Sequence, residues 1–95
     1  MIPIGLVVMV FQIPGCHSLK ENRGLLKSMI TNLRKVFNVS VAEVDYQDSW
    51  QKTAIACAIA GSDRVVLERS LQSIPDYCEI NFRLFQLVDQ RIELN

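Results

Sequence analysis

The sequence predicts an α+β fold with its elements in the order β-α-β-β-α-β, and three patterns lead to this prediction. Two segments, residues 4–13 and 53–60, are apolar on both sides, as expected of strands that are covered on both faces. Residues 19–36 carry apolar side chains at helical spacing, and residues 39–45 alternate as a partly solvated strand does. The 95 residues, 49% of them hydrophobic, suffice for one core, so we expect a single domain over residues 1–95.

A clear boundary separates the first strand from the first helix. Pro14 and Gly15 end the strand, and Ser18 with Glu21 three residues later forms a capping box that starts the helix at about Leu19. At 100° per residue, six apolar side chains of this helix fall within an arc of about 140°. This arc, expected to face the sheet, consists of Leu25, Leu26, Met29, Ile30, Leu33 and Val36.

In the second strand, Val39 and Val41 are expected to point to one side, with Ser40 and Ala42 on the other. The polar residues 46–52, which include the single Trp, then connect to the second apolar strand.

The second helix is predicted to start after Asp63, and Pro75 is expected to end it or kink it, because the proline ring clashes with the preceding turn. Residues 76–80 could continue the helix beyond a kink. The last strand is predicted at about residues 82–94, with mixed polarity. The predicted core side chains of this helix are Val66, Leu67, Ser70, Leu71 and Ile74.

The polarity of the four strands favours one topology. In a split β-α-β arrangement with sheet order 4-1-3-2, strands one and three are the central pair, and these are the two fully apolar strands. Right-handed crossovers place both helices on one face, which gives a ferredoxin-like two-layer sandwich. The other face would expose apolar side chains of strand one, either Val7, Met9 and Phe11 or their alternates. We therefore expect a homodimer or larger assembly through this open face.

Charge and cysteine usage exclude several classes of protein. Ten Lys and Arg balance ten Asp and Glu, so net charge alone points to no polyanionic partner. Cys16, Cys57 and Cys78 are far apart and form no C-x-x-C pair, which favours neither a zinc site nor a disulfide framework, and fits a reduced cytoplasm. Cys57 is expected to be buried and inert. The apolar N-terminal segment is much shorter than the ~20 residues that a bilayer requires, so we expect no membrane partner.

Two groups of side chains could carry chemistry. Cys16 and His17 are sequence neighbours, but neighbours rarely orient as a thiolate-activating pair, and a solvated turn is the favoured interpretation. Glu43 and Asp45, on one face of a strand, could converge with Asp48 on a hard cation. A solvated strand end with Lys or Arg partners is the favoured alternative. We expect no metal and no cofactor.

The first helix also carries a basic stripe. Lys20, Lys27 and Arg34 recur every seven residues, and Arg23 falls within the same arc of about 60°. Residues 17–36 hold five positive charges against one negative charge. Such a row can neutralise phosphates without reading sequence, although any amphipathic helix needs a solvated side.

Several segments together resemble the YlxP-like family, a group of small bacterial proteins of unknown function. The resemblance covers about residues 4–60 and is carried by Pro14-Gly15, by Ser18 to Glu21, by Arg23, by the run from Phe37 to Asp45, and by three later residues. The family-motif residues are Ser18, Glu21, Asn38, Ser40, Glu43, Asp45, Asp48, Trp50 and Gln51.

The chain departs from the family pattern at three positions. Tyr46 stands where a histidine is common, which weakens any scheme with a base or metal ligand there. Asn22 stands in place of a lysine, and Gly24 in place of a better helix former.

The resemblance implies a ferredoxin-like fold, a bacterial cytoplasmic location and no established activity. Family genes often lie beside those for translation initiation factor two and ribosome-binding factor A, which implies a translation context. We therefore expect a protein that is not an enzyme but a binding module for ribosomal RNA or a ribosomal subunit, with Lys20, Arg23, Lys27 and Arg34 as contacts. The alternative is an oligomeric regulatory or scaffolding domain that binds a small ligand, at the loop of residues 14–18 or at a subunit junction.

Overall fold

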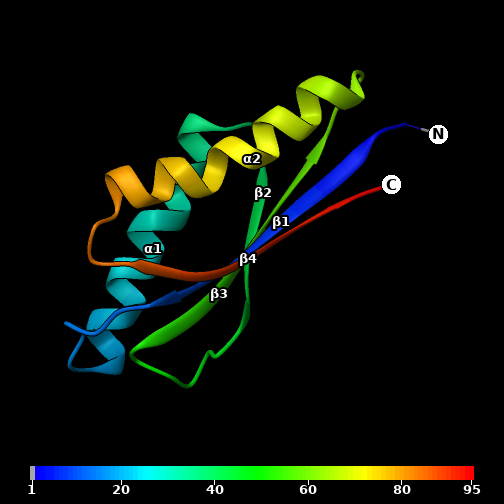
Figure 1. Cartoon of the computed structure of the whole chain (residues 1–95). Coiled ribbons are helices and arrows are strands. Elements are labelled where there is room, and N and C mark those ends of the chain that lie inside the picture. Colours follow the sequence, from blue (N-terminus) through cyan, green and yellow to red (C-terminus); the bar gives the residue numbers. More distant parts are fainter. Residues whose placement is uncertain (1) are drawn as a thin grey trace.

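A computed structural model describes residues 2–95, and these residues form four strands and two helices (Figure 1). The strands make one antiparallel sheet in the order β2-β3-β1-β4, which is the predicted order read from the other edge. The α+β, ferredoxin-like prediction is therefore confirmed. The elements are β1 (Ile4–Gln12), α1 (Leu19–Val36), β2 (Ser40–Asp45), β3 (Lys52–Ala60), α2 (Arg64–Asn81) and β4 (Gln86–Leu94).

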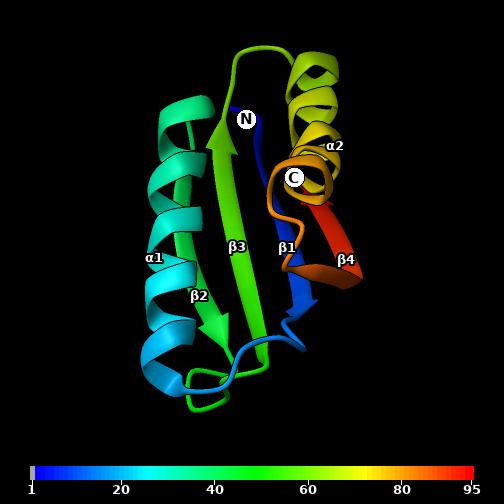
Figure 2. The ribbon, with the colours of Figure 1, turned by 90° about the vertical axis from the view of Figure 1, so that its left-hand side faces the viewer.

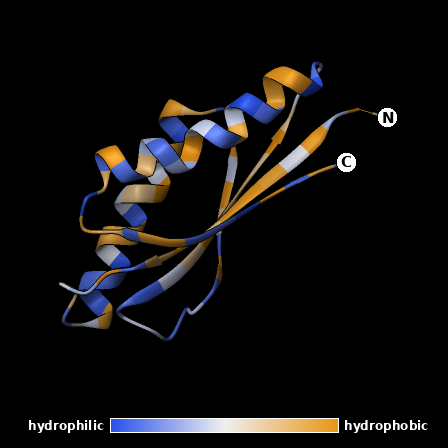
Figure 3. Ribbon diagram, viewed as in Figure 1, coloured by the Kyte–Doolittle hydropathy of each residue, from blue (hydrophilic) through white to orange (hydrophobic). Residues whose placement is uncertain are grey.

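Both helices lie on the same face of the sheet, side by side (Figure 2). Helix α1 packs over the β2 side, whereas α2 packs mainly over β1 and β4. The central pair, β1 and β3, is the predicted pair, and Figure 3 shows β1 hydrophobic over most of its length while β4 is mixed. Neither helix in residues 2–95 is long and apolar enough to cross a membrane.

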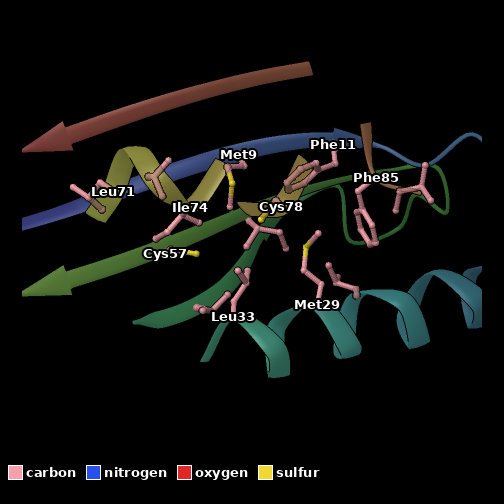
Figure 4. Close-up of a cluster of buried hydrophobic side chains, with 14 of the residues drawn as sticks. Met9, Phe11, Met29, Leu33, Cys57, Leu71, Ile74, Cys78 and Phe85 are labelled. Atoms are coloured by element: carbon pink, nitrogen blue, oxygen red, sulfur yellow. The ribbon is translucent and has the colours of Figure 1, made fainter. Parts of the chain in front are cut away.

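The core fills the space between the sheet and the two helices (Figure 4). Alternate residues of β1 point into it, and so do Ile55 and Cys57 of β3, because the β1–β3 register places these side chains on one face. Cys57 is fully buried, so the predicted burial of this residue is confirmed. This burial raises the pKa of the Cys57 thiol to about 11. The largest core side chains are Met9, Phe11, Ile13, Met29, Leu33, Ile55, Leu71 and Ile74.

Helix α1 begins and ends where the sequence predicts. The Ser18 Oγ accepts a hydrogen bond from the Glu21 N–H at 3.1 Å, as in a capping box. The Glu21 carboxylate reaches one residue further than a capping box requires, to the His17 N–H at 3.5 Å. Most of the predicted apolar arc faces the sheet, but Val36 at the last turn is half-exposed.

Helix α2 continues past Pro75 to Asn81, so Pro75 does not end the helix and the alternative in which residues 76–80 continue it is confirmed. Pro75 is itself buried, and Ile74 before it and Cys78 after it pack into the same core. This packing offsets the hydrogen bond that proline cannot donate. The predicted core position of Val66 is wrong, since its side chain is exposed, and Ser70 is only partly buried. Because the buried residues of α2 run from Leu67 to Cys78, the centre of its buried face lies on a different side of the helix from Val66.

Strand β4 starts later than predicted. Phe82 caps α2, with its N–H donating to the Cys78 carbonyl, and the Phe85 N–H then donates to the Phe82 carbonyl in a turn. Phe85 folds into the core, edge-on to Phe11 at 5.6 Å between ring centroids. The residues from Phe82 to Phe85 are therefore a connection that buries an aromatic side chain, and the ladder begins at Gln86.

Candidate functional site

The predicted basic stripe divides into two parts in the structure. Lys20 and Lys27 are exposed, and their side chains make no hydrogen bond or ion pair within residues 2–95. Arg34 is also exposed but donates one hydrogen bond to the Val41 carbonyl at 3.1 Å. Lys35, which is exposed one residue further on, adds a fourth cation to this side of α1. We call Lys20, Lys27, Arg34 and Lys35 the basic surface of α1.

Arg23 is the predicted contact that does not fit this surface. Its guanidinium donates to both carboxylate oxygens of Glu43, at 2.6 and 2.8 Å. The same Glu43 oxygen that accepts the second bond also accepts one from the Thr53 hydroxyl at 2.8 Å. The Arg23 charge is therefore balanced by Glu43 in the free protein.

The pKa values of this pair reflect the bidentate contact. The hydrogen bonds from Arg23 hold the pKa of Glu43 below its ordinary value of 4.5, against the opposing effect of burial. The hydrogen bonds to Glu43 raise the pKa of Arg23 in turn. The Glu43 side chain is 10% exposed and that of Arg23 is 40% exposed, so the pair is covered on the carboxylate side and solvated on the other.

Asn22 completes this polar cluster, although the sequence analysis assigned it no role. It is fully buried, its side-chain nitrogen donates to the Trp50 carbonyl at 2.9 Å, and its oxygen accepts two hydrogen bonds from Arg23. Asn22 therefore ties the first turn of α1 to the β2–β3 connection. A sequence signal was available, because Asn22 falls in the middle of the apolar arc of α1, where a polar side chain needs partners.

The three carboxylates Glu43, Asp45 and Asp48 do not converge. A register shift between Glu43 and Asp45 pairs these two residues with neighbouring positions of β3, Ile55 and Ala54, which face opposite sides of the sheet. The prediction that they share a face is therefore wrong. Asp45 instead accepts a hydrogen bond from the N–H of Tyr46, which has a left-handed backbone with φ of 62°. In residues 2–95 no three His, Cys, Asp or Glu side chains are placed to hold a metal.

Cys16 and His17 do not form a catalytic pair. The Cys16 thiol is buried and donates to the Ser18 carbonyl at 3.3 Å, while His17 is exposed. The Gln51 side chain donates to the Cys16 and Pro14 carbonyls, which holds this loop against the end of β3.

Most of the family-motif residues gather at one end of the molecule, around the loops before α1 and after β2. There Ser18 and Glu21 cap α1, and Gln51 joins the two loops. The backbone carbonyl of Trp50 accepts a hydrogen bond from Asn22, and the Trp50 side chain is 48% exposed. Asn38 and Ser40 lie at the opposite end of β2. The main structural role of the motif residues is therefore to hold α1 in place against the sheet.

The outer side of α1 is hollowed where its side chains are small. Gly24, Ser28 and Thr31 line a shallow depression of about 450 Å³, and Lys27 and Lys35 line it as well. No atom lies within 4 Å of the position that a Cβ would take at Gly24. Helix backbone at this point is therefore open to close approach from solvent.

Comparisons with known proteins agree with the family resemblance seen in the sequence. Residues 4–92 match the family described as "Protein of unknown function (DUF503)". The "Uncharacterized protein YlxP" of Bacillus subtilis (strain 168) is 46% identical over 57 residues, which are 60% of this chain and 62% of that protein. The match thus spans less than two thirds of that relative's length.

A solved structure of a single-residue mutant of SnoaB, "a cofactor-independent oxygenase from Streptomyces nogalater", is 9% identical with a TM-score of 0.49. That likeness covers 100% of this chain and 92% of that chain, and at this score it carries no argument. The family match extends over nearly the whole fold, from the first residue of β1 almost to the end of β4. The chain therefore belongs to the DUF503 family of proteins of unknown function.

Proposed function

We propose that this protein is a non-enzymatic binding module whose basic surface on α1 contacts the phosphate backbone of structured RNA. The observation that carries the proposal is the separation of charge along α1. Lys20, Lys27 and Lys35 are exposed, and their side chains have no partner in residues 2–95, whereas Arg23 is paired with Glu43. The free cations therefore lie together on the side of α1 that faces away from the core.

The depression on α1 supports a backbone ligand in particular. Lys27 and Lys35 flank a floor of small residues, so a phosphate could approach the helix while both ammonium groups remain within reach. Ser28 and Thr31 supply hydroxyls that can bond to phosphate or ribose oxygens. Such contacts position a nucleic acid without reading its bases. The translation context implied by the family resemblance favours ribosomal RNA as this polyanion.

The test compares two double variants with the same change in charge. Lys27→Gln with Lys35→Gln removes the cations beside the depression, whereas Arg69→Gln with Arg83→Gln removes two cations outside α1. Binding to a labelled RNA hairpin is measured over a range of salt concentrations, together with sedimentation alongside ribosomal subunits from a low-salt lysate.

Four phosphate contacts give a log–log salt slope of roughly −2.8 to −3.6, and the α1 double variant should reduce it to roughly −1.4 to −1.8. The control variant should bind with nearly the parent slope. Equal weakening by both variants would mean that only net charge matters, and a parent that neither binds RNA nor travels with subunits would end the proposal.

The alternative is an oligomeric regulatory or scaffolding domain, and the uncovered sheet face favours its oligomeric part. The ligand would sit at the loop of residues 14–18 or between subunits. A thermal-shift screen of nucleotides, amino acids and metabolites separates the two functions, because only this one requires stabilisation by a small molecule. Stabilisation that persists in the Lys27→Gln, Lys35→Gln variant would favour the alternative.

A further inference from the structure

The helices leave one face of the sheet uncovered (Figure 1), and the side chains on this face differ in size from strand to strand. Leu6, Val8 and Val10 of β1 share this face, since Val7, Met9 and Phe11 point into the core. In the β1–β3 register, Leu6 lies beside Ala58, Val8 beside Ala56 and Val10 beside Ala54. Ala54 is already buried in the single chain, so a ridge of larger side chains on β1 runs alongside a trough of small side chains formed by Ala56 and Ala58 on β3.

The borders of this face are more polar. On β4, Asp89, Arg91 and Glu93 lie next to the β1 ridge, and Arg91 and Glu93 form an exposed ion pair at 3.3 Å. On the other side, β2 presents Ser40 and Ala42, both exposed. An apolar centre with a polar rim is the usual anatomy of a protein interface.

We propose that a second copy of this chain packs on this face, with a two-fold axis that runs along the strands between β1 and β3. That axis places the β1 ridge of each copy over the alanine trough of the other. A two-fold interface needs a surface that is complementary to itself, and a ridge beside a matching trough meets this need. An axis across the strands would stack ridge on ridge and trough on trough, which would leave voids between the sheets.

The area of the face fits such a dimer. Strands about 4.8 Å apart, three of them with nine residues and β2 with six, at about 3.4 Å per residue, give a projected face of roughly 540 Å². Stable interfaces bury about 800 Å² per partner, so this face can support a dimer of modest affinity if most of it is used. Stacked sheets cross at about −30°, so the match is best at the centre, where Val8 lies beside Ala56. This inference is independent of the RNA proposal, because α1 lies on the other side of the sheet.

The test uses two single-cysteine additions near the centre of the face. Val8→Cys and Ala56→Cys proteins, one of them with a mass tag, are treated with a short thiol-to-thiol cross-linker separately and as a mixture. The three native cysteines are buried, so the parent protein is the unreactive control. The proposed axis places position 8 of one copy over position 56 of the other, so the mixture should give mainly the tagged–untagged product.

Strong cross-linking of Val8→Cys with itself would instead establish the axis across the strands and overturn the proposal. A second variant, Ala56→Glu, keeps the test independent of cross-linking efficiency. It buries an unpaired charge in the dimer but leaves it in water in the monomer, so the dimer dissociation constant should rise roughly tenfold or more. A parent that remains at 10.8 kDa by light scattering at high micromolar concentration would also overturn the proposal.

Discussion

The two helices have the same length and cover the same sheet, yet they are held to it in different ways. Helix α2 packs through apolar side chains, including Leu71, Ile74 and Cys78, and continues into a series of edge-to-face aromatic pairs that links Tyr77, Phe82 and Phe85. Helix α1 buries Leu26, Met29 and Leu33, but its first turns are fastened by hydrogen bonds and an ion pair.

This difference relates to what each helix exposes. The contacts of Asn22 and Arg23 fix the position of α1 from its sheet-facing side and its β2 side. The outer side carries lysines and small residues that are not part of this attachment. A directional attachment thus fixes the orientation of α1, whereas α2 depends on the volume of its buried side chains. Three substitutions test this comparison.

The largest effect is expected for Ile74→Ala in the α2 half. This side chain is fully buried beside Pro75, and its truncation leaves a cavity that should lower the free energy of unfolding by about 2–5 kcal/mol. Urea denaturation measures the loss. Ile80→Ala, on the same helix but 66% exposed, is the control and should change stability by less than about 0.5 kcal/mol. Similar losses at the two positions would show that α2 is not held by its buried stripe.

An intermediate effect that depends on pH is expected for Glu43→Gln in the α1 half. The loss at pH 7 should be about 1–2 kcal/mol, less than for a fully buried charge pair because Arg23 is 40% exposed to screening water. Since the pKa of Glu43 is lowered in the folded state, its contribution is complete above the ordinary value of 4.5 and is lost as the pH falls through the folded value.

The stabilities of parent and variant should therefore converge at acid pH. The control is Glu93→Gln, which removes an exposed ion pair with Arg91 and should have little effect at any pH. A Glu43→Gln loss that stays constant down to about pH 3 would mean that its shape, and not its charge, matters.

The smallest effect is a gain in stability from Gly24→Ala. Nothing lies within 4 Å of the added methyl group, and the helix gains about 0.5–1 kcal/mol from the reduced freedom of the unfolded chain. Gly5→Ala is the matched control with the opposite sign, because its methyl group would meet Leu71 at 2.5 Å and Leu94 at 2.8 Å beneath α2. Thermal unfolding of both variants should give one midpoint above and one below that of the parent.

The sequence predicted the sheet order and both ends of α1 because these depend on long, regular polarity patterns. It left the end of α2 open at Pro75, where the helix continues because the residues on both sides of the proline are buried, and it failed at Val66, whose side chain is exposed. It failed again at Glu43 and Asp45, because the register shift between them turns the two side chains to opposite faces of the sheet. Such a shift cannot be recognised from the residue composition of the strand. The sequence also could not show that Arg23 forms an ion pair, because its partner Glu43 lies on another element, β2.

The hydrogen bond from Arg34 to the Val41 carbonyl has a consequence for how the protein avoids aggregation. Strand β2 is an outer strand of the sheet, and unpaired carbonyls along such an edge can recruit a strand from another molecule. Arg34 occupies one of these acceptors, and the irregular step near Val44 disturbs the ladder further along the same strand. The opposite edge, β4, carries Asp89, Arg91 and Glu93, whose charges oppose lateral growth. If the proposed dimer forms through the uncovered face, these edge features separate it from strand addition at the sides of the sheet, and a closed pair is then favoured over a fibre.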